Sequence, residues 1–149
     1  MGPFTWLTSS AQVMPSIILV SVWKSLGFTM VIFMAGLTTI PSQLYEAARI
    51  DGASSRQVFL RICLPLLQPT MLFVLVTGVI EGMQMFTQVH VLTDGGPGTA
   101  SLVMVKHLYN HAFEYFRMGR ASAIAFILFA WILAVTLLQI RFFREGFEY

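Results

Sequence analysis

Residues 121–140 read ASAIAFILFAWILAVTLLQI, a run without a charged side chain or a proline. A helix needs about 20 apolar residues to cross a hydrocarbon core of about 30 Å, so this run is long enough to span a membrane. Arg120 and Arg141 flank it, and both side chains can extend to lipid headgroups. A buried helix of a soluble protein would carry a continuous polar stripe, which this run lacks. The stretch therefore predicts a membrane-spanning helix.

The composition of the whole chain supports a membrane protein. Of its 149 residues, 56% are hydrophobic and 11% are charged, whereas a soluble domain has about 25% charged residues. The low charge argues against a disordered tail, and a single cysteine excludes an internal disulfide. Nine basic residues are offset by seven acidic ones and are spread along the chain, which argues against a nucleic-acid partner.

Two further stretches have the length and hydropathy of spans. The first covers about residues 13–37 and contains Lys24, and the second covers about residues 70–92 and contains Glu81. Charged groups are costly inside a bilayer, so they normally face the interior of a helix bundle. We therefore predict an all-α membrane protein: a bundle of about three transmembrane helices at about 13–37, 70–92 and 121–140.

The basic residues predict the orientation of this bundle. The loop 41–69 and the C-terminal tail carry five of them, against three on the other side: Arg49, Arg56, Arg61, Arg141 and Arg144, against Lys106, Arg117 and Arg120. By the positive-inside rule, the loop and the C-terminus lie in the cytoplasm. The N-terminus then lies outside without a signal peptide before it. We therefore expect the chain to lack an N-terminal half, through truncation, a split gene or a misassigned start.

The loop 41–69 has the pattern of two short helices. Ser42 is placed to cap the first helix, and Gly52 to end it in the left-handed conformation. Ser54 or Ser55 can cap the second, which has apolar residues at helical spacing: Val58, Phe59, Ile62 and Leu66. A thin first helix with an exposed acid can enter a cleft on another protein. A loop lying on the membrane surface is the alternative.

Two motifs carry a resemblance to a known family. Glu46-Ala47-Ala48, then three residues and Gly52, then nine residues and Ile62-x-Leu64-Pro65, resembles the EAA loop of ABC importer permeases. Residues 46–54 are similar to the form found in carbohydrate importers, and residues 91–97 resemble the outside loop of F-type maltose permeases. The resemblance implies that residues 1–149 are an ABC transporter transmembrane (permease) domain, the C-terminal half of a six-helix permease core with a cytoplasmic two-helix coupling loop.

This resemblance also implies a function. The chain would be a permease subunit of a binding-protein-dependent ABC importer for a sugar, in the inner (cytoplasmic) membrane and in contact with membrane lipid. The implied partners are a second permease subunit, ABC ATPase subunits and an extracytoplasmic solute-binding protein. ATP hydrolysis belongs to the ATPase, so the chain is not expected to be an enzyme or to hold a cofactor, and it has no Walker A sequence. The positions that match the family's contact with the ATPase are Tyr45, Glu46, Ala47, Ala48, Asp51 and Gly52.

A polar stripe marks the second span, at i, i+3, i+4 and i+7: Glu81, Gln84, Met85 and Gln88. Residues at this spacing share one face of a helix, and polar side chains in a membrane should face inward. Ser25 and Thr29, one turn apart on the first span, can face the same cavity. We predict that these six residues line the solute pathway. A polar seam that only joins helices is the alternative.

Weaker signals surround this stripe. Lys24 can pair with Glu81 or extend to the outer interface, and Gly27 can interrupt the first span. On the outside, residues 102–116 have the pattern of an amphipathic helix. His107 and His111 have a spacing found in zinc sites, but without a clear third ligand we predict no metal site.

Other functions stay open from the sequence. The same machinery can carry a polyol or a glycerol phosphate ester, and a small membrane assembly protein would have no transport role. A membrane enzyme has the least support, because no nucleophile–base pair or metal cluster is evident.

Overall fold

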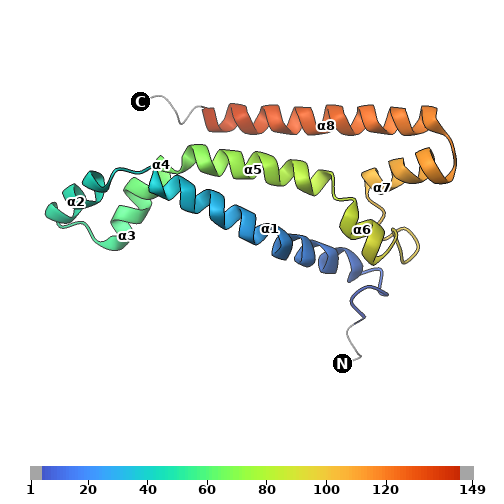
Figure 1. The fold of residues 1–149 in the computed structure, drawn as a ribbon, viewed down its shortest axis with the longest axis horizontal. Helices are drawn as coiled ribbons and strands as arrows, with labels where there is room; N and C mark the ends of the chain where they lie inside the picture. Colours follow the sequence, from blue (N-terminus) through green and yellow to red (C-terminus); the bar gives the residue numbers. More distant parts are fainter. Residues whose placement is uncertain (1–4, 145–149) are drawn as a thin grey trace.

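The computed structural model describes residues 5–144, and the regular elements in this range are all helices (Figure 1). Three helical segments have the length and hydropathy of membrane spans: Val13–Thr38, Gln68–Leu92 and Met118–Phe143. They run antiparallel, so the C-terminal end of α8 (Met118–Arg144) lies at the same end of the bundle as the loop between the first two spans (Figure 1). The predicted all-α fold with three spans is confirmed.

The first span is one uninterrupted helix, α1 (Val13–Thr38). Its only proline, Pro15, lies in the first turn, where backbone N–H groups have no partner within the helix. Hydroxyl groups along α1 donate to carbonyls one turn earlier, as Ser21 Oγ does to Ile17 O at 2.9 Å. The interruption considered at Gly27 is therefore absent.

The second span is broken, so the prediction of one continuous helix over 70–92 is wrong. Helix α5 (Gln68–Met83) ends before Gln84, and α6 (Thr87–Leu92) begins three residues later. Gly78 and Gly82 weaken the last turns of α5, since glycine is about 1 kcal/mol less favourable than alanine in a helix. The ring of Phe86, just past the break, stacks 4.9 Å from His90 and lies 5.0 Å from Tyr109. These ring contacts fix the chain where the helix stops.

Two short helices form the loop between α1 and α5, as predicted. Helix α2 (Ser42–Ile50) begins directly after Pro41, and Ser42 makes no capping hydrogen bond, so its predicted role as a cap is wrong. Helix α3 (Ser55–Val58) has a capping box: Ser54 Oγ accepts from the Gln57 N–H at 3.4 Å, and the Ser54 N–H donates to Gln57 Oε1 at 2.8 Å.

A π-helical turn, η1 (Phe59–Cys63), joins α3 to α4 (Leu64–Leu66). Its wider turn rotates the side chains that follow it around the helix axis. The buried residues are therefore Cys63 and Leu67, while Phe59 and Leu66 are exposed. The apolar face predicted from regular helical spacing over 58–66 is wrong for this reason.

The opposite end of the bundle holds α7 (Met104–Tyr109) and a second π-helical turn, η2 (Asn110–Glu114). Together they are shorter than the amphipathic helix predicted over residues 102–116. The helical segment ends before Phe116, which has φ 52° and is 80% exposed. A small core of Val13, Ile17 and Val89 packs α6 against the start of α1. This core fixes the outer part of the broken span.

Candidate functional site

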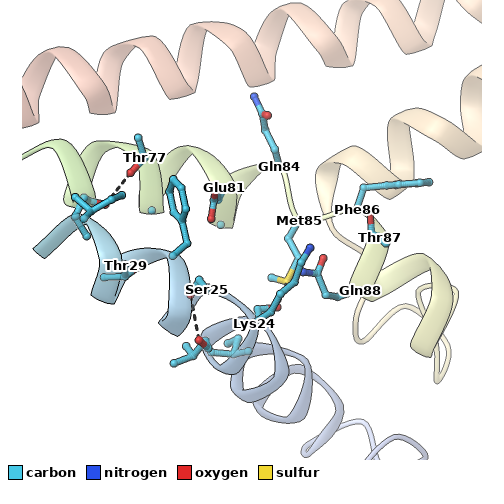
Figure 2. A pocket seen from close by; sticks show the side chains of 18 residues that line it. Lys24, Ser25, Thr29, Thr77, Glu81, Gln84, Met85, Phe86, Thr87 and Gln88 are labelled. Atoms are coloured by element: carbon cyan, nitrogen blue, oxygen red, sulfur yellow. Dashed lines mark hydrogen bonds between the residues drawn. The ribbon is translucent and has the colours of Figure 1, made fainter. Parts of the chain in front are cut away.

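A cavity of about 760 Å³ lies between α1 and the break in the second span (Figure 2). All six residues predicted for the solute pathway line it: Ser25, Thr29, Glu81, Gln84, Met85 and Gln88. The structure therefore brings these side chains to one place. Their part in transport stays a prediction.

The wall on the α1 side is a stripe of hydroxyl groups at a spacing of four residues. Ser21, Ser25 and Thr29 share this face of the helix. Ser25 Oγ donates to Val22 O at 3.1 Å, and Ser21 Oγ lies 3.1 Å from Met85 Sδ on the facing segment. The hydroxyls are thus directed by their own helix and by the facing segment.

The opposite wall does not have the geometry that the sequence predicted. Because α5 ends at Met83, the stripe from Glu81 to Gln88 is not one helix face, and that prediction is wrong. Gln84 points toward α8, whereas Met85 and Gln88 point toward α1 (Figure 2). All of these residues still line the cavity, because the chain changes direction at the break and follows the edge of the cavity. Residues on two separate helices therefore form this wall.

Opposite charges line the cavity without pairing. Lys24 and Glu81 are both exposed lining residues, and they form no ion pair with each other. The pairing considered from the sequence is therefore absent in the structure. Together with Gln84 and Gln88, these groups offer both hydrogen-bond donors and acceptors to a bound solute.

The sequence pattern missed several lining residues: Ser21, Phe28, Thr77, Phe86 and Thr87. Ser21 lies four residues before Ser25, and Thr77 lies four before Glu81, so extending the i, i+4 pattern would have found both. No periodic signal indicates Phe86 or Thr87, because they follow a break that the pattern did not predict.

Helix α2 ends in a hydrogen-bonding pattern that requires a left-handed residue. Gly52 has φ 74°, its N–H donates to Arg49 O at 3.1 Å, and the Ala53 N–H donates to Ala48 O at 2.9 Å. These two bonds are those of a Schellman motif. Gly52 thus ends the helix as predicted, and it sets the direction in which the chain leaves for α3.

The two faces of α2 have different surroundings. Tyr45 is half-buried and accepts a hydrogen bond from Cys63 Sγ at 3.5 Å, and Ala48 is buried beside it. These two predicted contact residues therefore pack within the loop. Glu46, Ala47, Asp51 and Gly52 are exposed, and so is Ile50 at 87%, which the sequence analysis missed. A large apolar side chain left exposed on a polar helix was the available signal.

The histidines on the outer segment do not form a metal centre. Within residues 5–144, no group of three or more His, Cys, Asp or Glu side chains is placed to hold a metal ion. The rings of His107 and His111 lie edge to face, 4.6 Å apart. Burial is the main cause that lowers the pKa of His111, followed by the nearby His107, Arg120 and Arg117 side chains.

Three antiparallel spans, a polar cavity at a broken helix and a two-helix loop at the far end are features of a transporter membrane domain. Residues 2–144 match the model of the family described as binding-protein-dependent transport system inner membrane component, and the chain belongs to this family. The family supplies the inner-membrane component of a transport system, not a catalytic subunit.

Relatives within this family are permease proteins. The chain is 36% identical over 141 residues to the arabinooligosaccharides transport system permease protein AraP of Bacillus subtilis, covering 94% of this chain and 45% of AraP. It is 38% identical over 138 residues to the multiple sugar-binding transport system permease protein MsmF of Streptococcus mutans, covering 93% and 47%. It is 34% identical over 139 residues to the sulfoquinovosyl glycerol transport system permease protein SmoG of Agrobacterium fabrum, covering 93% and 45%. The chain spans about half the length of these curated relatives.

Proposed function

We propose that this chain forms part of the permease of an ABC importer, where it lines the solute pathway and couples it to a partner ATPase. The observation that carries the proposal is the polar cavity at the break between α5 and α6. Interrupted helices at mid-membrane are a recurring way to build a transporter binding site, because they free polar groups to face a solute.

The lining favours a sugar as the solute. Hydroxyl-rich molecules are recognised by amides, carboxylates and hydroxyls, which Gln88, Glu81 and Thr29 supply. The rings of Phe28 and Phe86, also in the lining, can cover the apolar face of a sugar ring. The names of AraP and MsmF point to the same class of solute.

Coupling to ATP hydrolysis is assigned to α2. Its exposed face, with Glu46, Ala47 and Ile50, is suited to a groove on an ATPase subunit. This places the two-helix loop and the C-terminus in the cytoplasm. Further partners are a second permease subunit and an extracytoplasmic solute-binding protein. Closure of the ATPase subunits would then bias the cavity between inward-facing and outward-facing states.

A second candidate solute is anionic. Lys24 places an ammonium group at the cavity, and such a group favours an anionic solute, such as a phosphate ester or a sulfonate of a glycerol or sugar. The name of SmoG points to a solute of this kind. Charge at the cavity therefore distinguishes the two solute classes.

Uptake measurements test both the function and the solute class. Cells that contain the assembled importer are given radiolabelled neutral oligosaccharides, polyols or glycerol phosphate esters. We expect uptake of a neutral sugar, and a Lys24→Met variant should retain it. Uptake of anionic esters alone, abolished by Lys24→Met, would instead assign the second class. An importer that is assembled, hydrolyses ATP and takes up none of these solutes contradicts the proposal.

A further inference from the structure

Lys106 on α7 is the largest side chain that is completely buried in the described part of the chain. A buried ammonium group is costly unless anionic and hydrogen-bonding partners surround it. Lys106 Nζ lies 2.7 Å from Asp94 Oδ1 and 3.1 Å from Glu114 Oε1, and 5.1 Å from the centre of the Tyr109 ring. Its partners come from the segment before α7 and from the turn after it.

Asp94 is itself fixed to the end of α6. Its N–H donates to Val89 O at 2.8 Å, and its backbone is left-handed, with φ 52°. Aspartate tolerates this conformation better than most residues. Val89 O also accepts from the N–H of Thr93 at 3.1 Å. His90 Nδ1, one turn before Asp94, lies 3.0 Å from the same Oδ1. The Asp94 carboxylate is therefore held at the C-terminal end of α6 by its own backbone and by His90.

Both members of this ion pair keep their charge at neutral pH. Burial lowers the pKa of Lys106, but the hydrogen bonds that it donates to Asp94 and Glu114, together with their negative charges, outweigh this effect, so the pKa is raised overall. The hydrogen bond from Lys106 is the main cause that lowers the pKa of Asp94. The contact is thus an ion pair at neutral pH.

Helix α6 also faces the cavity. Thr87 and Gln88 in its first turn line the cavity, whereas Val89 packs on Val13 and Ile17 of α1. The helix is too short to be stable alone, and the break before it removes support from α5. Besides the packing of Val89 on α1, the position of α6 therefore depends on contacts at its C-terminal end, where Asp94 meets Lys106.

We propose that Lys106 is a positioning residue for the cavity: through Asp94 it fixes α6, and α6 places Gln88 against the solute pathway. Lys106 does not line the cavity and acts only through the short helix. The role of the cavity in transport rests on the proposed function, but the placement of Gln88 does not.

Thiol labelling tests the placement without requiring transport. In a Cys63→Ala background, Gln88→Cys on α6 and Thr29→Cys on α1 are made separately, and the full chain in membranes is reacted with a hydrophilic methanethiosulfonate reagent. Adding Lys106→Met should change the labelling rate at position 88 by at least roughly tenfold, the scale of one hydrogen bond to a charged group. The rate at position 29 should change less than about twofold.

Three further variants separate positioning from a general loss of packing. Lys106→Arg should restore the labelling rate at position 88, because it keeps the charge. Asp94→Asn should reproduce the effect of Lys106→Met while leaving the buried lysine in place, since 69% of the Asp94 side chain is exposed. The two changes combined should do no more than either alone, as expected for residues that act through one contact. Glu114→Gln should leave position 88 unchanged, because Glu114 has no bond to α6.

The outcomes decide the proposal in each case. An unchanged rate at position 88 in both Lys106→Met and Asp94→Asn overturns it. If Lys106→Met alters positions 29 and 88 equally, Asp94→Asn decides: a change confined to position 88 supports the proposal, and any other result overturns it. Failure of the proposed function would appear separately, as an absence of solute uptake by the unaltered importer.

Discussion

Gly36 on α1 and Thr70 on α5 approach so closely that a Cβ atom at Gly36 would lie 2.5 Å from Thr70 Oγ1 and 3.0 Å from its Cγ2. Rotating the threonine exchanges one of these atoms for the other, because the side chain is branched at Cβ. Leu67 Cδ2, at 3.1 Å, closes the remaining side. The first two spans therefore pack so closely, near their junctions with the two-helix loop, that no side chain fits at Gly36.

Gly36→Ala is expected to destabilise this contact. Forcing an extra methyl group into a filled space costs about 1–3 kcal/mol. The measurement is the thermal unfolding midpoint of the purified chain in detergent. Gly27→Ala is the matched control on the same helix, since a Cβ there meets nothing within 4 Å and alanine is the better helix former. Equal midpoints for the two variants would contradict the close contact.

Gly52→Val should uncouple ATP hydrolysis from uptake while leaving membrane insertion intact. The backbone at Gly52 has φ 74°, and the left-handed conformation costs a residue with a Cβ roughly 1–2 kcal/mol. Valine should change the end of α2 and hence the direction of its exposed face. Gly52→Asn, which tolerates the same conformation, should be much less harmful. Normal coupled uptake by the valine variant would show that the α2 terminus does not matter for transmission.

Gln88→Leu should weaken solute uptake more than Gln84→Leu does. Gln88 points toward α1 and the Lys24 side of the cavity, whereas Gln84 points toward α8 (Figure 2). Loss of one hydrogen bond of about 0.5–1.5 kcal/mol corresponds to a roughly two- to tenfold rise in KM. Leu75→Ala, outside the cavity lining, controls for altered packing. A larger effect from Gln84 would place the solute nearer to α8.

The ionic contact between Lys106 and Asp94 should stabilise the fold equally from about pH 5 to pH 9. The lowered pKa of Asp94 gives stability that is complete above the ordinary aspartate value of about 3.9, and that is lost as the pH falls through the lowered pKa. The raised pKa of Lys106 gives stability that is complete below about 10.4 and is lost only at higher pH. The unfolding midpoints of the unaltered chain and Lys106→Met, measured across pH, should converge only outside this range, in strong acid or in strong base. A difference that disappears near pH 6 would assign the effect to a histidine.

Ser55→Cys, in the Cys63→Ala background, should react with a membrane-impermeant thiol reagent only from the cytoplasmic side. Ser55 is exposed at the start of α3, in the loop that is proposed to face the ATPase. Thr99→Cys, exposed in the segment between α6 and α7, should react only from outside, because these two helices lie at the other end of the bundle (Figure 1). The reverse result in intact cells would invert the proposed orientation.

The spans and the two-helix loop were predictable because their causes are local. Hydropathy alone defines a span, and the capping box at Ser54 and the left-handed turn at Gly52 depend on residues within one turn. The Ser42 cap failed because Pro41 already has the extended backbone conformation of a residue preceding a helix.

The broken span and the buried lysine depend on contacts between distant segments. The helix is interrupted at Phe86, whose ring packs on Tyr109, and no short-range sequence pattern indicates that contact. Lys106 resembled an exposed residue of an amphipathic helix, since its partner Asp94 lies in a turn beyond any helical period. The same reason explains why the six predicted residues line one cavity although the predicted helix face is wrong: local spacing and polarity identified them, and tertiary contacts set their orientation.

The break in the second span also divides the cavity wall mechanically. The helical hydrogen-bond ladder of α5 finishes where the Gln84 N–H donates to Ile80 O, and a new ladder starts where the His90 N–H donates to Phe86 O. Rotation or sliding of α5 therefore is not transmitted along a rigid rod to α6. In the proposed transport cycle, Glu81 would move with the half of the molecule that carries α2, while Gln88 would stay with the outer end. A movement of α5 would therefore shift the two parts of this wall past each other around a bound solute, rather than displace the whole wall.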